Sequence, residues 1–197
     1  MVRMSEAWKK YYEVNSGKPP HRKTVEALDY LSRLRKPSGL SALDFGCGAG
    51  RDTRALIDAG MTVTAVDAEE QGVALLRADS IPELTAVCSQ FDAFSFGSYD
   101  FITSRFALSF NPPETFEAMF GALIGSLNPG GLLACNIFGL KDEWNDGRPM
   151  TFMDEKRIKA LLGDVEIIEL QETDVDGTRA DGTPKHWNYY DILAVKK

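Results

Sequence analysis

The sequence has few cysteines and histidines and no long apolar run. Three cysteines and two histidines occur among 197 residues. The cysteines lack CxxC spacing, so we expect reduced thiols and no metal site. The longest mostly apolar stretch, Gly130 to Leu140, is about half of the ~20 residues that a bilayer crossing requires. The opening MVRMSEAWKK lacks the apolar region of a secretory signal. These absences favour a cytoplasmic protein without a membrane partner.

Positive charge is scarce overall but concentrated near the N-terminus. The chain has 22 Lys and Arg against 29 Asp and Glu, a net charge of −7. This charge repels a polyphosphate backbone and disfavours nucleic acid as a partner. Residues 1–36 nevertheless hold nine basic and four acidic side chains, a local +5. This segment is either a solvated helical face or a basic lid over a small anionic ligand.

The order of apolar segments predicts one α/β domain over residues 1–197, with 1–23 as an N-terminal lid and 24–197 as a binding fold. Strand-length apolar runs alternate with helix-like segments, which is typical of βαβ units and a parallel sheet. The expected strands are 41–45, 62–67, 84–88, 99–104, 132–138, 165–172 and 187–195, and the expected helices are 5–12, 24–35, 52–59, 69–78, 113–125 and 154–162. No helix separates the last two strands, so we expect them to pair antiparallel.

A glycine-rich turn follows the first expected strand and precedes a helix. The run is Asp44-Phe45-Gly46-Cys47-Gly48-Ala49-Gly50, in which glycines permit positive φ and a close approach of a ligand to the backbone. The dinucleotide fingerprint GxGxxG fails, because its third glycine falls on Arg51 or Thr53. Asp52 also stands at the helix N-terminus, where a phosphate would require positive charge. We therefore expect a ligand without phosphate.

Together these features resemble the class I S-adenosylmethionine-dependent methyltransferases. The resemblance rests on the DFGCGAG run, Asp67 at the end of the second strand, Asp92 after the third, and the terminal antiparallel pair. The GCGAGRDT run, the WKKYY…GKPP opening and the DGTPKHW…YYDILAVKK ending are similar to bacterial small-molecule methyltransferases of the tellurite-resistance and thiopurine methyltransferase type. The resemblance implies a Rossmann-like three-layer sandwich with a seven-stranded sheet in the order 3-2-1-4-5-7-6 and strand 7 antiparallel.

The resemblance also implies a site for S-adenosylmethionine, whose product is S-adenosylhomocysteine. Asp67 with Ala68 would meet the ribose hydroxyls, because a carboxylate can accept two hydrogen bonds from a diol. Asp92 would accept the adenine amino group with the Ala93 amide on the ring, although Asp92 could instead cap a turn. The other implied contacts come from the acid and turn after the first strand, from the end of the fourth strand and from the lid: Asp44, Gly46, Cys47, Gly48, Gly50, Ser104, Phe106, Tyr11 and Tyr12.

Three residues are candidates for catalysis on the acceptor side: His21 in the lid, Arg105 after the fourth strand and His186 at the start of the seventh. An antiparallel seventh strand begins at the C-terminal edge of its parallel neighbours, where ligands bind. The alternative for both histidines is a surface or structural role. We expect these residues to converge with Arg22 and Lys185 on one pocket mouth. Such a mouth suits an ionised acceptor, such as a thiol, a chalcogen oxyanion or an acidic hydroxyl.

Asn111-Pro112-Pro113 is similar to the NPP core of enzymes that methylate amino groups of nucleic acids. In those enzymes the motif lies immediately at the end of strand 4, whereas residues 104–110 intervene here. Proline is favoured in the first turn of a helix. We therefore interpret the motif as a helix start.

The sequence thus predicts an enzyme that moves the methyl group of S-adenosylmethionine to a small-molecule acceptor, as a monomer or homodimer. Transfer from a sulfonium is an in-line displacement governed by positioning, so few catalytic residues need be visible. One alternative is a non-catalytic S-adenosylmethionine-binding sensor or partner subunit of the same fold. A NAD-dependent oxidoreductase is the less favoured alternative, because the dinucleotide fingerprint fails.

Overall fold

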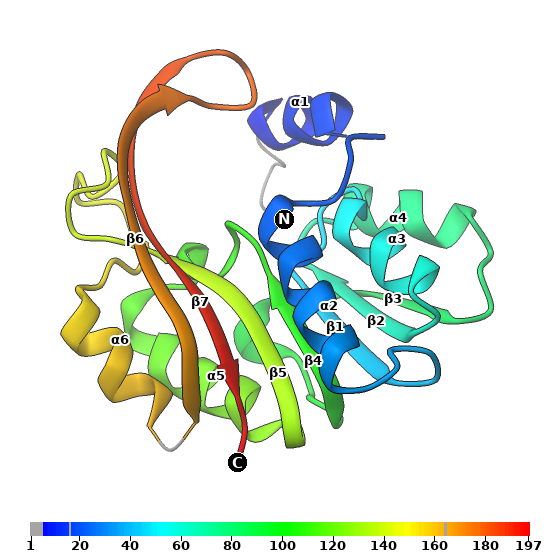
Figure 1. Cartoon of the computed structure of the whole chain (residues 1–197). Coiled ribbons are helices and arrows are strands. Elements are labelled where there is room, and N and C mark those ends of the chain that lie inside the picture. The colour runs from blue at the N-terminus through cyan, green and yellow to red at the C-terminus, as the bar shows by residue number, and fades with distance from the viewer. Residues whose placement is uncertain (1–5, 16, 164) are drawn as a thin grey trace.

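A seven-stranded sheet with helices on both faces organises the computed structural model, which describes residues 6–15, 17–163 and 165–197 (Figure 1). The strands are β1 (Ser41–Phe45), β2 (Thr62–Asp67), β3 (Leu84–Cys88), β4 (Tyr99–Ser104), β5 (Leu127–Phe138), β6 (Glu166–Thr178) and β7 (Pro184–Val195). Their order is β3-β2-β1-β4-β5-β7-β6, and β7 runs antiparallel to β5 and to β6. The predicted sheet order and the antiparallel seventh strand are confirmed.

Alternate residues of the central strands face opposite helical layers. Ala42 and Phe101 pack in the cluster that contains Leu31 of α2 and the buried face of α3. Leu43 and Ile102 pack in the larger cluster with α5 and α6. β1 and β4 are buried on both faces and read as continuous apolar runs. The edge strand β3 is only partly buried, and the sequence located all four strands β1 to β4 at their observed bounds.

The helices are α1 (Glu6–Asn15), α2 (Arg22–Leu34), α3 (Arg51–Asp58), α4 (Glu70–Ala78), α5 (Pro113–Gly125) and α6 (Glu155–Leu162). Two short 3-10 helices span Phe91–Ala93 and Leu108–Phe110. α1 continues beyond its predicted end at Tyr12 to Asn15, whose side-chain amide donates to the carbonyl of Tyr11 at 2.7 Å. Among the residues that the structure describes, every helix is too short or too polar to cross a bilayer.

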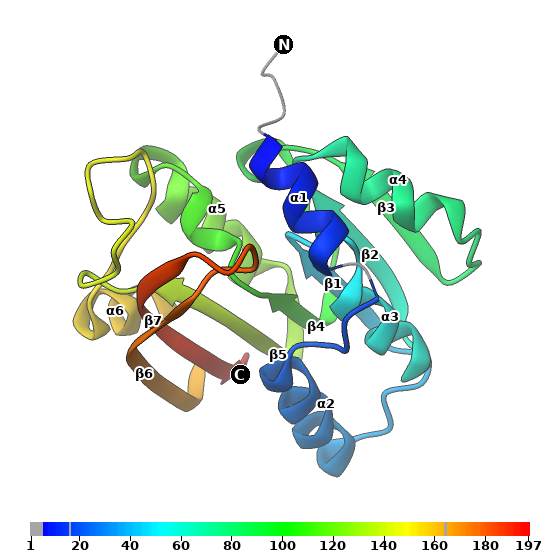
Figure 2. The ribbon, with the colours of Figure 1, turned by 90° about the horizontal axis from the view of Figure 1, so that it is seen from above.

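The last two strands are longer than predicted and form an arm beyond the sheet. The final pair between β5 and β7 is Phe138 with Tyr189, but β6 and β7 continue to pair as far as Thr178 with Pro184. The polar segment expected to be a loop is therefore mostly hairpin. Figures 1 and 2 show this arm curving over the C-terminal edge of the sheet toward α1.

A buried ion pair ties the distal end of this arm to the segment after β5. The Lys185 ammonium lies 2.5 Å from Oδ1 of Asp142, and both side chains are fully buried. The same nitrogen lies 3.9 Å from the ring centroid of Trp187 and 4.5 Å from that of Trp144. Asp142 also accepts the backbone N–H groups of Trp144 and Asn188. Burial lowers the pKa of Lys185, so the lysine depends on its carboxylate partner.

We expect Asp142→Ala to lower the free energy of unfolding by about 3–5 kcal/mol, because it leaves the Lys185 ammonium buried without its counter-ion. Lys185→Met should cost less, since Asp142 keeps two backbone donors. Urea unfolding followed by tryptophan fluorescence measures both changes. The matched control is Lys141→Met, because the Lys141 side chain is 63% exposed. Equal destabilisation by all three variants would contradict a special role for the buried pair.

Candidate functional site

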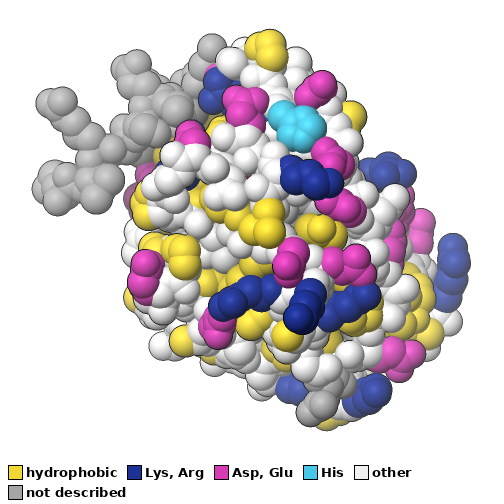
Figure 3. Space-filling view, turned by 90° about the vertical axis from the view of Figure 1, so that its left-hand side faces the viewer, with side chains coloured by type: hydrophobic (Ala, Val, Ile, Leu, Met, Phe, Trp, Pro, Cys, Tyr) yellow, Lys and Arg dark blue, Asp and Glu magenta, His cyan; other side chains and the backbone are white. Residues whose placement is uncertain are grey.

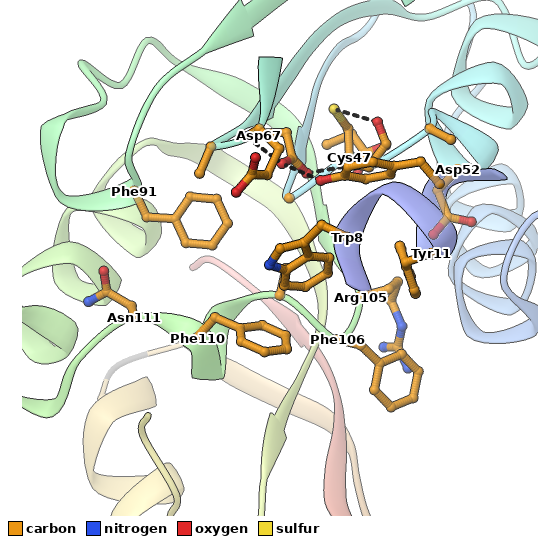
Figure 4. Close-up of a pocket in the computed structure, with 18 of the residues that line it drawn as sticks. Trp8, Tyr11, Cys47, Asp52, Asp67, Phe91, Arg105, Phe106, Phe110 and Asn111 are labelled. Carbon is orange, nitrogen blue, oxygen red and sulfur yellow. Dashed lines mark hydrogen bonds between the residues drawn. The ribbon is translucent and has the colours of Figure 1, made fainter. Parts of the chain in front are cut away.

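A cavity of about 730 Å³ lies at the C-terminal edge of the sheet. Its volume falls within the range of small-molecule sites. The walls come from α1, the turn after β1, the end of β2 and the segments that follow β3 and β4 (Figure 4). The strand order reverses between β1 and β4, and open parallel sheets bind ligands at such a reversal.

The turn after β1 depends on glycine at two positions. Gly46 and Gly50 have φ values of +89° and +80°. A Cβ on Gly46 would lie 2.2 Å from Cβ of Ala107, and one on Gly50 would lie 2.2 Å from the side chain of Leu76. Gly46 and Gly48 line the cavity, whereas Gly50 is the N-cap of α3. Because Gly46 has no side chain, the turn can pack against the segment after β4. Because Gly50 has none, it can also pack against α4.

Asp67, the last residue of β2, is held at the cavity by three donors. Oδ2 accepts the backbone N–H of Gly48 at 2.8 Å, and Oδ1 accepts the backbone N–H of Glu69 at 3.0 Å. The Tyr12 hydroxyl also donates to Oδ1, at 3.1 Å. Burial raises the pKa of Asp67 while these donors oppose the rise. Asp67 is thus an oriented acceptor with one side-chain donor and two backbone donors.

Two further carboxylates are buried beside the turn. Oδ2 of Asp44 accepts the Thr53 hydroxyl at 2.5 Å, and Oδ1 of Asp52 accepts the backbone N–H of His21 at 2.6 Å. Burial raises the pKa of Asp44, and the negative charge of Asp52 raises it further. Burial likewise raises the pKa of Asp52, although the His21 N–H and the Arg51 charge oppose it. Both carboxyl groups are therefore harder to ionise here than in water.

His21 enters the cavity as a neutral donor. Its Nδ1 accepts the backbone N–H of Lys23 at 3.3 Å, so the proton of the neutral ring resides on Nε2. Burial lowers the pKa of His21 to about 3, with Arg105 and Arg51 as the largest charge contributions. Arg105 also lines the cavity, and its guanidinium forms a buried ion pair with Asp191 of β7.

Phe106 has a backbone conformation that is uncommon for a residue other than glycine. Its φ is +52°, in the left-handed region. Its backbone N–H donates to Oδ1 of Asn136 on β5 at 2.6 Å. Its ring centroid lies 5.4 Å from that of His21 and 5.0 Å from that of Tyr189. The Asn136 bond holds the Phe106 ring in the wall between the glycine turn and the β6–β7 arm.

α1 supplies an aromatic cover that the sequence predicted in part. Tyr11 and Tyr12 line the cavity as expected, and Trp8 joins them. The Trp8 ring centroid lies 5.2 Å from that of Phe110, which belongs to the segment after β4 (Figure 4). Helical spacing of three and four residues places Trp8 on the same face as both tyrosines, and this signal could have identified it. No sequence pattern pointed to Phe110.

Most of the predicted cofactor residues line the cavity: Asp44, Gly46, Cys47, Gly48, Asp67, Ala68, Asp92, Phe106, Tyr11 and Tyr12. Ser104 lies outside the lining and donates its hydroxyl to the Phe45 carbonyl at 2.5 Å. Ala93 also lies outside it, and its amide already donates to the Gln90 carbonyl at 3.2 Å. Asn111 and Pro112 of the NPP run do line the cavity, and the run begins α5 as predicted.

The expected convergence of basic residues is only partial. His21 and Arg105 line the cavity, but Arg22 is 78% exposed and pairs with Glu26 on α2. Lys185 is buried against Asp142. His186 does not line the cavity; its side chain is 37% exposed, with its ring nitrogens 2.9 Å from Asp174 and 2.7 Å from Asp176. Figure 3 shows the mixed acidic and basic side chains on one face of the molecule. The arm extends beyond the end of β5. The first residues of β7, including Lys185 and His186, therefore lie beyond the expected mouth of the pocket.

We expect the His21 ring to stay neutral between pH 5 and 8, because its pKa is lowered to about 3. His186 should keep its ring proton to a higher pH than an ordinary histidine, because hydrogen bonds from its ring to Asp176 and Asp174 raise its pKa. Two-dimensional NMR of ring-labelled protein separates the two. Below the unfolded-state pKa of about 6.5, His21 binds a proton in the unfolded chain but not in the folded protein. The free energy of unfolding contributed by His21 therefore falls as the pH drops from 6.5 toward 3. A His21 midpoint near 6.5 would refute its burial as a neutral donor.

Comparison with known proteins finds methyltransferase matches for part of the chain. Residues 42–131 match the methyltransferase domain family. Over 122 residues the chain is 31% identical to a ubiquinone biosynthesis O-methyltransferase of Xanthomonas axonopodis pv. citri (strain 306), covering 59% of this chain and 50% of that protein. A carboxy-S-adenosyl-L-methionine synthase of Shewanella sp. (strain ANA-3) is 29% identical over 114 residues, covering 53% of this chain and 46% of that protein. The chain spans about half the length of the curated relatives it matches.

Solved structures share the fold. TehB from Haemophilus influenzae superposes with a TM-score of 0.75 at 24% identity, covering 90% of this chain and 62% of that chain. Magnesium protoporphyrin IX methyltransferase (ChlM) from Synechocystis PCC 6803, solved with bound SAH, gives a TM-score of 0.73 at 19% identity and covers 98% and 95% of the two chains. The predicted resemblance to S-adenosylmethionine-dependent methyltransferases is confirmed at the level of the fold: this chain has the fold of these solved structures, and its residues 42–131 match the methyltransferase domain family.

Proposed function

We propose that the protein transfers the methyl group of S-adenosylmethionine to a small molecule. The observation that carries this proposal is the position of Asp67 beside the glycine turn, at the reversal of strand order. A carboxylate at the end of β2 suits a ribose diol. The acid at the start of α3, Asp52, disfavours a ligand with phosphate at the same turn. Adenosine without phosphate fits both features.

The walls of the cavity suit each part of such a cofactor. A ribose hydroxyl would replace the Tyr12 hydroxyl on Asp67, while the two backbone donors keep the carboxylate in place. Gln90, Phe91 and Asp92 line the cavity next to Ala68, where adenine would find an aromatic face and a carboxylate for its amino group. A charge-assisted hydrogen bond to Asp92 is stronger than a neutral one. The amide of Ala93 is not part of this proposal, because Gln90 already accepts it.

The residues of the protein would position the two reactants, exclude water from them and offer polar contacts. S-adenosylmethionine supplies an electrophilic methyl group when bound. The Phe106 ring lies between the glycine turn and the acceptor side, where its face can meet a cation. His21 offers an Nε2–H donor and carries no free lone pair at that atom, so it suits an acceptor that is already ionised. A thiol, a chalcogen oxyanion or an acidic hydroxyl meets this condition, as the sequence also suggested.

The N-terminal segment is proposed to act as a lid. Trp8 and Tyr12 of α1 contact opposite sides of the cavity, at Phe110 and Asp67. With the Tyr12 hydroxyl displaced from Asp67 by the ribose, α1 would still cover the cavity through the contact of Trp8 with Phe110, and this cover would exclude water from the reaction. A cytoplasmic location and a monomeric or homodimeric state stay predictions.

We expect the purified protein to bind S-adenosylhomocysteine in calorimetry, and Asp67→Ala to weaken this binding by about 1–3 kcal/mol, the cost of unpaired hydroxyls. Tyr12→Phe is the matched control, because it removes only the hydroxyl that the ribose replaces. It should keep the affinity within about threefold, well under a 1.4 kcal/mol step. Tighter binding of NADH than of S-adenosylhomocysteine would favour the oxidoreductase alternative instead.

We expect His21→Ala to lower turnover at least about tenfold, or 1.4 kcal/mol, while its affinity for S-adenosylhomocysteine stays within about threefold. The reason is the loss of the Nε2–H donor on the acceptor side. The assay follows transfer from methyl-labelled S-adenosylmethionine to a panel of a thiol, tellurite and a phenol. His186→Ala is the control, because His186 does not line the cavity, and it should behave like the parent. Firm cofactor binding without transfer to any acceptor would favour a non-catalytic sensor.

A further inference from the structure

We infer that Asn136 of β5 is a positioning residue for methyl transfer, because it holds the corner that Arg105 and Phe106 form after β4 and thereby the Phe106 ring. The inference rests on the proposed function, in which that ring faces the reacting groups. Asn136 is 1% exposed and lies outside the cavity lining, so it would act only through the corner. No sequence pattern pointed to this residue.

The corner begins where β4 separates from β5. The last pair between these strands is Ser104 with Cys135, so β4 stops pairing one residue before Asn136. The Asn136 side chain then takes the place of a strand contact, because its Oδ1 accepts the backbone N–H of Phe106 at 2.6 Å. The chain thus leaves the sheet at a point that a side chain defines.

The conformation of Phe106 needs such a restraint. Its φ of +52° lies in the left-handed region, which costs free energy for a residue with a side chain. Conformations of this kind persist only where the surroundings fix them, and they concentrate at functional sites. The hydrogen bond to Asn136 holds the backbone of Phe106, while the rings of His21 and Tyr189 lie 5.4 and 5.0 Å from its ring. The backbone and the ring of Phe106 are therefore both restrained.

The residue that pairs with Asn136 holds the other half of the corner. Asn136 is opposite Asp191 in the antiparallel ladder between β5 and β7. The Asp191 carboxylate forms the buried ion pair with the guanidinium of Arg105. Figure 4 shows the side chains of Arg105 and Phe106 on the side of the cavity away from Asp67. One residue pair of the sheet thus restrains two consecutive residues of the corner.

The stability of the fold does not account for an amide at position 136. Nδ2 of Asn136 is buried and lacks a hydrogen-bond partner among the residues that the structure describes. An unsatisfied buried donor costs free energy, which an apolar side chain of similar volume would avoid. A strained backbone and an unpaired amide therefore meet at one hydrogen bond. Such local conflicts are typical of functional sites, and here they favour a fixed position of Phe106 over stability.

The test is a double-mutant cycle on turnover, in which Asn136→Leu is made in the parent protein and in the Phe106→Gly variant. Leucine has a similar volume but cannot accept the backbone N–H. In the parent, Asn136→Leu should lower kcat by about 10-fold or more, because the displaced ring no longer faces the reacting groups. In the Phe106→Gly background it should change kcat by less than about threefold. Glycine adopts positive φ without strain, and no ring is left to position.

Two further measurements separate positioning from a general loss of structure. The affinity of Asn136→Leu for S-adenosylhomocysteine should stay within about threefold of the parent, because Asp67 keeps its own backbone donors. Hydrogen exchange of the Phe106 amide should become at least about 10-fold faster. Ile137→Val is the matched control, since Ile137 is the next residue of β5 and is buried on the opposite face of the sheet. It should change neither kcat nor this exchange rate.

Asn136→Met also lacks the oxygen acceptor and has an adaptable shape, so the cycle can be completed with it if the leucine variant does not fold. Equal effects on kcat in the two backgrounds would overturn the positioning role, and so would an unchanged exchange rate of the Phe106 amide. Absence of methyl transfer by the parent to a thiol, tellurite and a phenol would instead overturn the proposed function, and this inference with it.

Discussion

The site is organised by the need to satisfy carboxylates that the sheet buries at its C-terminal edge. A buried charge is tolerated only when donors or a cation face it. Asp67 draws the turn after β1 and the start of α4 close through backbone N–H groups. Asp52 draws the start of α2 to that of α3 in the same way. The positions of the glycine turn, of His21 and of α1 follow from these few hydrogen bonds.

Much of the fold could be predicted because burial on both faces leaves a direct trace in the sequence. β1 to β4 appear as short apolar runs, and glycine or proline marks most of the connections between them. The order of the strands came from the family resemblance, since apolar runs do not say which strands are neighbours. The arm was under-predicted because the outer half of β6 and β7 pairs only with itself. The β6 side of the arm is mostly polar and exposed, so it resembles a loop in the sequence.

The cofactor side of the site was easier to predict than the acceptor side, for a physical reason. Gly46 and Gly48 act through backbone conformation, and the Asp67 carboxylate is held by nearby backbone N–H groups at a strand end, so a local motif records all three. The position of the Lys185 side chain depends on Asp142, and that of the His186 side chain depends on Asp174 and Asp176. The buried partner, Asp142, lies 43 residues away along the chain. A side chain's charge is visible in the sequence, but its partner and its direction are set by tertiary packing.

The contact between Gly46 and Ala107 makes the turn after β1 and the segment after β4 one mechanical unit. A methyl group on Gly46 would overlap the methyl group of Ala107, so neither loop can shift toward the other, and enlarging either residue separates them. Ala107 directly follows Phe106, whose ring belongs to the opposite wall. Any side chain at position 46 would therefore change the separation of these two walls. The width of the cavity depends in this way on one residue without a side chain.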